Sequence, residues 1–178
     1  MTKNLVMSYE LSWRTDEDKK FMKSAEWKNI RKNILERDDY TCQYCGVQRK
    51  TFLQINHIDG NPKEHSEENL EVICSACHKI THSGLWAVIF GILDVYEESK
   101  YSQNEIVSIT GEMRDQGKPD EEIIEFLGLK KKVMWQKDFE YLKTKFGFIT
   151  SRKMNKGVPE RPITERQQQA SLKNRKNW

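Results

Sequence analysis

Two C-x-x-C pairs constrain the fold of this chain more than any other feature. Cys42 and Cys45 form the first pair, Cys74 and Cys77 form the second, and 28 residues separate the pairs. Tetrahedral Zn²⁺ accepts four thiolates at about 2.3 Å, and each C-x-x-C turn presents two sulfur atoms toward one point. Four sulfurs fill the coordination sphere, so we expect a closed, structural zinc site. Two thiol-redox motifs are the disfavoured alternative, because neither pair follows a recognisable βαβ pattern.

The composition is that of a water-soluble chain with a modest core. The chain has 178 residues, of which 37% are hydrophobic and 32% charged. It contains no apolar run of about 18 residues, so no membrane span is expected. The first residues lack the basic and apolar regions of a secretory signal. We therefore expect a cytoplasmic protein, in which paired cysteines favour metal over disulfides.

The net charge of +3 is unevenly distributed. From residue 129 onward there are 14 Lys and Arg against 4 Asp and Glu, whereas the first 128 residues are acidic overall. A basic end beside an acidic body suggests contact with a polyanion, although basic tails are often only solvated.

Hydrophobic periodicity predicts an α+β fold in the first hundred residues. A helix is expected over 16–37, with a restart at Ser24. Further expected elements are short strands over 51–58 and 70–74, a helix from Ser75, and a buried apolar helix over 85–98 that Gly84 separates from it.

A second, helical unit is expected beyond residue 100. Helical spacing extends over 103–117, 119–130 and 134–147, with Asp120 as an N-cap and Gly128 as a stop. The expected organisation is an N-terminal arm (1–19), a metal-binding domain (20–99), a helical extension (100–150) and a basic, flexible tail (151–178).

All four histidines lie between the cysteine pairs or just after them. His78 and His82 are four residues apart on a predicted helix, so they face the same side and can share a metal ion. His57 lies on the opposing strand beside Asn56. These residues suit a hydrolytic site with an open coordination position. His65 fits no motif spacing and is expected to be an exposed loop residue.

Residues 26–83 resemble the HNH endonuclease family, and within it the zinc-stabilised branch with two C-x-x-C pairs. The resemblance is carried by WKNIRKNILERDDYTCQYCG, INHIDGN and ENLEVICSACHKITH, in the order and spacing of the family. It covers under half of the chain. It implies the ββα-metal fold, here flanked by helices and followed by the helical extension.

The resemblance also implies a role for each motif residue. His57 would be the general base that deprotonates the attacking water, and Asn69 would hold the histidine loop and orient that base. Asn56, His78 and His82 would bind the catalytic ion, Mg²⁺, Mn²⁺ or another divalent cation. Position 56 is often aspartate or histidine in the family, so Asn56 is a weaker, neutral ligand.

These roles imply a metal-dependent DNA endonuclease, encoded by a bacterium or phage and acting most readily on double-stranded DNA. One such site nicks one strand, so double-strand cleavage would need two visits or a homodimer. Four side chains are candidates for phosphate contact, with a solvated helix face as the alternative for each: Arg31, Lys32, Arg37 and Lys79.

Two other hypotheses belong to different classes. In the first, the chain is a non-catalytic zinc module that binds nucleic acid or protein. In the second, it is an interaction adaptor that uses an exposed apolar helix over 85–96.

Overall fold

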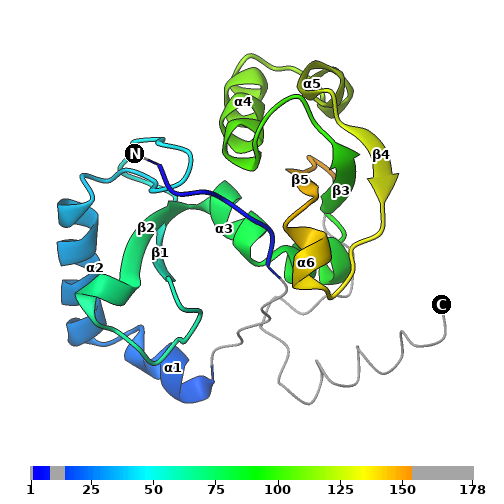
Figure 1. The fold of residues 1–178 in the computed structure, drawn as a ribbon. Coiled ribbons are helices and arrows are strands. Elements are labelled where there is room, and N and C mark those ends of the chain that lie inside the picture. Colours follow the sequence, from blue (N-terminus) through cyan, green and yellow to red (C-terminus); the bar gives the residue numbers. More distant parts are fainter. Residues whose placement is uncertain (1, 9–14, 154–178) are drawn as a thin grey trace.

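The computed structural model describes residues 2–8 and 15–153, arranged as two groups of elements with the N-terminal segment running across both (Figure 1). The first group contains α1 (Asp16–Phe21), α2 (Ala25–Arg37), β1 (Leu53–His57), η1 (Glu67–Asn69), β2 (Leu70–Cys74), α3 (Ser75–Thr81) and η2 (Leu85–Ile89). The second contains β3 (Leu93–Glu98), α4 (Gln103–Asp115), α5 (Asp120–Leu127), β4 (Lys130–Val133), α6 (Phe139–Leu142) and β5 (Phe146–Ile149). The expected tail mostly falls on 154–178, outside the described residues.

The first group is a ββα module, which confirms the predicted α+β class. β1 and β2 pair antiparallel, with Leu53 opposite Cys74 and Asn56 opposite Glu71. α3 begins at the residue after β2, because Cys74 is both the last strand residue and the N-cap of the helix. The two strands and the helix therefore hold the cysteines and histidines in one place.

The predicted helix over 16–37 is two helices, and the restart at Ser24 is confirmed. The Ser24 hydroxyl accepts a hydrogen bond from the Trp27 backbone N–H at 3.0 Å, which caps α2. Trp27 and Ile34 are buried against the ββα module. α2 therefore covers one face of the two-stranded sheet.

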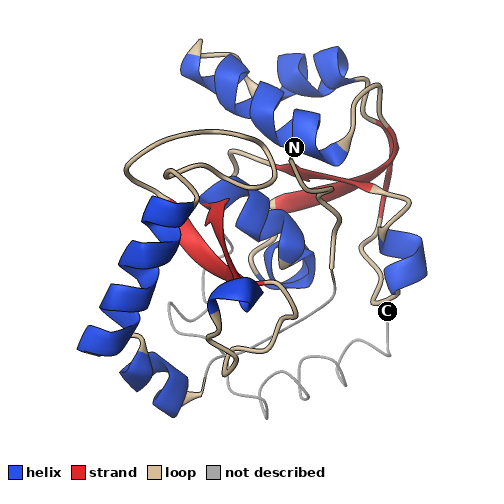
Figure 2. Cartoon of the chain, turned by 60° about the vertical axis from the view of Figure 1, so that its left-hand side comes forward, coloured by secondary structure: helices blue, strands red, loops and turns tan. Residues whose placement is uncertain are grey.

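The second group is built on a three-stranded antiparallel sheet in the order β4-β3-β5. The two sheets are separate red units in Figure 2, with α4 and α5 outside the larger one. Ile106 of α4 and Ile123 of α5 pack with Phe148 of β5 in a second core cluster. Gly128 ends α5 in the left-handed conformation, as expected. Pro119, rather than Asp120, is the N-cap.

Two helix predictions in this region are wrong. The run 85–98, expected as a buried helix, is a single π-helical turn followed by β3. Gly91 separates them with φ +67, a conformation that a helix does not continue through. The run 134–147, expected as a third helix, is helical only over Phe139–Leu142, and β5 starts within it.

The error over 85–98 has a clear physical cause. An apolar run of this length suits a buried strand as well as a buried helix, and only pairing with distant strands decides. Here β3 is the central strand, flanked by β4 and β5, so the extension is not wholly helical. The sheet also crosses the expected boundary at residue 99. The adaptor hypothesis required a helix over 85–96, which the structure does not contain.

Residues 2–8 of the expected N-terminal arm contribute side chains to the core. Leu5 and Met7 are each 1% exposed. The Asn104 side chain on α4 accepts from the Leu5 backbone N–H and donates to the carbonyls of Lys3 and Tyr44. The segment thereby joins the cysteine knuckle to the second group. No helix among the described residues is long and apolar enough to cross a membrane.

Candidate metal centres and active site

The four cysteines converge on one point. Their sulfur atoms all lie within 4.8 Å of one another, and the Cys45 and Cys74 sulfurs are 3.7 Å apart. Four thiolates around a tetrahedral Zn²⁺ at 2.3 Å are separated by about 3.8 Å, so the spacing fits the ion. It is far longer than a disulfide bond, and all four cysteines are free. The structure thus confirms the predicted grouping of both C-x-x-C pairs.

Four thiolates packed this closely would repel one another unless a cation lies among them. Hydrogen bonds from Cys45, Cys74 and Cys77 hold the pKa of Cys42 below its usual value. Hydrogen bonds with the three other cysteines raise the pKa of Cys77. One divalent ion removes this conflict, because it stabilises all four thiolates together. The cluster is buried apart from Cys45, as a closed structural site requires.

His78 and His82 meet beyond the cysteine cluster on α3. Their Nε2 atoms are 3.1 Å apart, and the two rings are nearly perpendicular. Two nitrogens that bind one ion at 2.0–2.1 Å lie about 2.9–3.4 Å apart at bond angles of 90–109°. The expected pairing of these two imidazoles is therefore present in a geometry that suits a shared metal ion.

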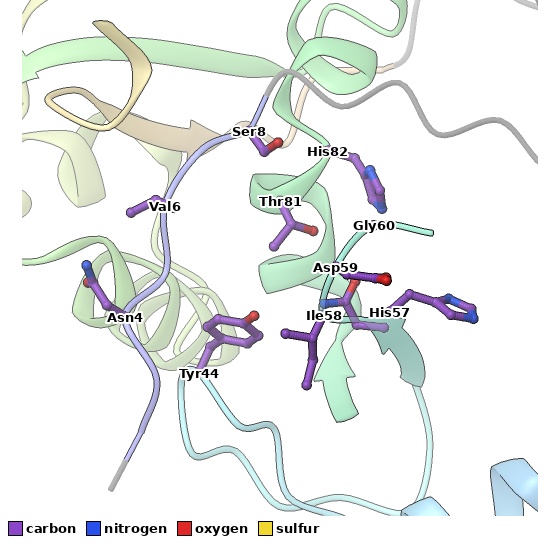
Figure 3. A pocket seen from close by; sticks show the side chains of 11 residues that line it. Asn4, Val6, Ser8, Tyr44, His57, Ile58, Asp59, Gly60, Thr81 and His82 are labelled. Carbon is purple, nitrogen blue, oxygen red and sulfur yellow. The ribbon is translucent and has the colours of Figure 1, made fainter. Parts of the chain in front are cut away.

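His57 and His82 line one cavity of about 210 Å³. His57 comes from the end of β1 and His82 from the end of α3, with Asp59 and Gly60 between them in the view of Figure 3. Asn56 lines the same cavity, and Asn4, Val6 and Ser8 of the N-terminal segment complete its far wall. Two of the three ligand candidates, Asn56 and His82, thus open onto the same space as the candidate base.

Asn56 is oriented by a buried carboxylate. Its Nδ2 donates to Glu71 Oε1 at 2.9 Å, which leaves the amide oxygen Oδ1 as the remaining ligand atom. Glu71 is 1% exposed and also accepts from Tyr44 Oη at 2.7 Å and Lys3 Nζ at 2.6 Å. Burial, followed by the neighbouring Glu71, raises the pKa of Tyr44, so its hydroxyl remains a donor at neutral pH.

Asn69 holds the loop that follows β1. Its Oδ1 accepts from the Asp59 backbone N–H at 3.1 Å, and its Nδ2 donates to Asp59 Oδ1 and to the Glu64 carbonyl. Asp59 Oδ1 also accepts from the Asn61 N–H at 2.8 Å, the largest cause of its lowered pKa. Asn61 and Asp59 are therefore turn formers, and Asp59 additionally faces the cavity.

The expectation that His65 is an exposed loop residue is wrong. It is half-buried, with its ring stacked on Phe21 at 4.3 Å and its Nδ1 3.2 Å from His57 Nε2. No motif spacing marks this histidine, because the loop folds back over β1 only in three dimensions.

The four candidate phosphate-binding side chains have different surroundings. Arg31 donates to the Leu53 carbonyl, and Arg37 donates to the carbonyls of Glu67 and Leu70, so both tie α2 to the sheet. Lys32 is exposed beside Glu36. Lys79 lies over the Trp86 ring at 5.0 Å, and burial lowers its pKa. DNA contact by these residues stays a prediction.

Glu71 and Tyr44 are site residues that motif spacing did not identify. The sequence did contain one signal for Glu71, since it is the single charged residue within the apolar strand LEVIC, directly opposite Asn56. A charge in a fully buried strand needs partners, and two of the partners of Glu71, Tyr44 and Asn56, line the cavity.

Comparison with known proteins places the motif in a family. Residues 42–84 match the model of the HNH endonuclease family. Over 56 residues the chain is 38% identical to Zorya protein ZorE of Escherichia coli, covering 30% of this chain and 15% of that protein. Over 66 residues it is 33% identical to Type 4 apparatus protein DotN of Legionella pneumophila, covering 37% of this chain and 30% of that protein.

The chain thus carries an HNH module with a four-cysteine cluster that is consistent with the zinc-stabilised branch. The module points to a nuclease-type or nucleic-acid-related function. The similarity spans less than a third of the length of either relative. The family model itself matches only residues 42–84 of this chain.

Proposed function

We propose that this chain is a metal-dependent DNA endonuclease whose active site is the cavity between β1 and the end of α3. The observation that carries the proposal is the convergence of His78 and His82 Nε2 at 3.1 Å, with His82 and His57 lining one cavity. The match of this segment to the HNH endonuclease model supports it independently.

In the proposed reaction His57 takes a proton from water at one of its ring nitrogens. The water oxygen then bonds to phosphorus while the bond from phosphorus to the leaving sugar oxygen breaks. An imidazole is suited to this step because its ordinary pKa is about 6.5. Asn69 keeps the loop beside His57 in place through its contacts with Asp59 and Glu64.

The catalytic ion would be held by the imidazoles of His78 and His82 and by Oδ1 of Asn56. When bound, a divalent ion neutralises charge on the phosphate and on the leaving oxygen. This donor set is uncharged and contains two imidazoles, which suits borderline transition metals better than the hard ion Mg²⁺. We therefore expect Ni²⁺ to support more activity than Mg²⁺.

The proposal is tested by cleavage of a supercoiled plasmid in the presence of each metal ion. The wild-type protein should convert it to the nicked form, and His57→Ala and His82→Ala should each reduce the rate at least 100-fold. Lys118→Ala, a surface change on the turn between α4 and α5, is the matched control and should cleave as the wild type does. An intact plasmid with the wild-type protein across metals and salt would end the proposal.

A non-catalytic nucleic-acid-binding module is the second candidate function. The HNH family that the sequence resembles often has aspartate or histidine at this ligand position, whereas this chain has the neutral amide of Asn56. The weaker ligand favours a function without catalysis. It predicts salt-dependent DNA binding that is the same for wild type and His57→Ala, with no nicked product. Measuring binding and cleavage in the same samples separates the two functions.

A further inference from the structure

Phe52 is the most exposed aromatic side chain in the described part of the chain, at 76%. It belongs to neither core cluster. The two other exposed phenylalanines each have a neighbour, since Phe126 stacks on Tyr101 and Phe139 lies under the Lys143 ammonium. A single exposed ring needs no explanation by itself. The backbone that carries Phe52 does need one.

The backbone of Phe52 is in the left-handed region, with φ +61. A bulky L-residue rarely adopts this conformation, because its Cβ crowds the neighbouring carbonyl oxygen. Tyr40 has a similar φ of +50, but its ring packs against the core, and that burial offsets the strain. Phe52 has no such burial. Strain that packing does not offset is typical of a residue kept for binding.

Hydrogen bonds fix the backbone around Phe52. The Ser75 N–H, at the start of α3, donates to the Phe52 carbonyl at 3.2 Å. Arg31 Nη2, on α2, donates to the Leu53 carbonyl at 2.8 Å. The end of the loop over residues 49–52 is therefore held by two helices. A ligand that contacts the ring would find it already in position, so little ordering entropy opposes binding.

Two positive charges precede the ring. Arg49 and Lys50 are both exposed, and among the described residues neither side chain forms an ion pair. Asp39, at the end of α2, instead accepts from Gln48 Nε2 at 2.8 Å. An exposed ring beside uncompensated cations is the combination that single-stranded nucleic acid binds, because bases stack on the ring while phosphates pair with the cations.

The loop lies within reach of nucleic acid bound at the cavity. Phe52 precedes His57 by five residues along β1, and a strand rises about 3.3 Å per residue, which separates the two by about 16 Å. Successive nucleotides in one DNA strand are about 3.4 Å apart along the helix axis, so this distance corresponds to about five base steps. One polynucleotide can therefore contact both places.

We propose that Phe52 stacks on an unpaired base while Arg49 and Lys50 contact the flanking phosphates, so that this loop binds single-stranded DNA. A phenyl ring has no hydrogen-bonding group, so the contact does not select a base. The inference goes beyond the proposed cleavage, which requires nothing of this loop. It concerns binding, and it holds whether or not the chain cuts DNA.

The proposal is tested by fluorescence anisotropy of the full-length, zinc-containing protein with a labelled single-stranded oligonucleotide or the duplex of the same sequence. No catalytic ion is added, so the result does not depend on cleavage. Phe52→Ala should weaken single-strand binding by at least about 5-fold and duplex binding by less than about 2-fold, because duplex bases are already stacked. Met134→Ala removes a side chain that is 79% exposed in the second group, and this control should bind as the wild type does.

Two further variants separate stacking from apolar contact. Phe52→Tyr keeps the ring and should bind the single strand within about 2-fold of the wild type. Phe52→Leu keeps an apolar side chain without a ring and should lose as much affinity as Phe52→Ala. Wild-type affinity in Phe52→Leu would overturn the proposal, since it indicates the kind of contact that a protein partner makes. Wild-type affinity in Phe52→Ala, or a wild-type protein that does not bind the single strand, would also overturn it.

The phosphate contacts have their own measurement. Each one contributes about 0.7 to the slope of log K against log salt for a single strand. The double variant Arg49→Ala and Lys50→Ala should therefore reduce the magnitude of that slope by about 1.4. An unchanged slope would contradict the part assigned to these two side chains.

A glycine variant controls for the fold of the loop. Glycine adopts the left-handed conformation without strain, so Phe52→Gly should melt at a higher temperature than Phe52→Ala. It should nevertheless bind the single strand as weakly as Phe52→Ala, because it has no ring. A glycine variant with wild-type affinity would show that the ring is not used in binding.

Discussion

At the scale of single residues, the cavity depends on one buried charge. Glu71 accepts hydrogen bonds from Lys3, Tyr44 and Asn56, three residues from three separate segments. Lys3 is half exposed, whereas Glu71 is 1% exposed, so the carboxylate bears most of the burial cost. Its three donors offset that cost and hold the Asn56 amide in one orientation.

Substitution of Glu71 should reveal this dependence. Glu71→Leu leaves the Tyr44 hydroxyl and the Asn56 amide without their acceptor, and should lower the free energy of unfolding by about 2–4 kcal/mol. Glu71→Gln keeps one acceptor oxygen and should cost about 1 kcal/mol. Urea denaturation in excess zinc measures both. A leucine variant as stable as the wild type would contradict a structural role for the carboxylate.

Residue spacing was sufficient to predict which candidate ligands meet, but not which residues hold them in place. The C-x-x-C pairs predicted the cysteine cluster that the structure contains. The i, i+4 spacing on a helix predicted the meeting of His78 and His82. The contacts of His65 were not predicted, because its partners Phe21 and His57 lie on different elements. Such contacts leave no periodic signal in a sequence.

At the scale of elements, the turn from α3 to η2 depends on a close approach of Trp135. The expectation that Gly84 separates two helical pieces is wrong, because its backbone is helical, with φ −59. A Cβ at this position would lie 2.8 Å from Trp135 Cζ2. Trp135 Nε1 donates to Ser83 Oγ, which in turn donates to the Ser8 carbonyl beside the cavity.

Gly84→Ala should therefore destabilise the protein although alanine favours helices. Crowding a methyl group against a packed ring typically costs about 1–3 kcal/mol. Thermal unfolding measures the loss, and Gly111→Ala is the matched control, since a Cβ there meets nothing within 4 Å. Gly111→Ala lies within α4 and should be neutral or slightly stabilising. A stabilised Gly84→Ala protein would show that Trp135 can move without cost.

At the scale of the whole molecule, a zinc ion held by the four cysteines would take the place of a larger core in the first group. β1 and β2 have five residues each and α3 has seven, and a two-stranded sheet of that size is only marginally stable by itself. Arg37, Asp38 and the N-terminal segment add hydrogen bonds around β2. Four metal–sulfur bonds would nevertheless be the strongest link between the Cys42–Cys45 knuckle and α3.

Removal of the zinc by a chelator should therefore unfold the ββα module, and not only abolish activity. We expect one tightly bound zinc per chain, and its removal should abolish protection of β1 and β2 in hydrogen exchange and lower the melting temperature by 10 °C or more. His82→Ala should retain the same zinc content, because the cysteine cluster does not include His82. Zinc release without any loss of exchange protection would disprove the structural role of the ion.

The sequence by itself determined the local features: the C-x-x-C knuckles, the cap at Ser24, the two short strands and the helix that carries His78 and His82. These follow from spacing, capping and alternation within a few residues. Tertiary structure alone decided that 93–98 is a strand, because its pairing partners are the distant strands β4 and β5. It also decided the contacts of Glu71 and His65, since buried polar groups find partners wherever the folded chain brings donors and acceptors together.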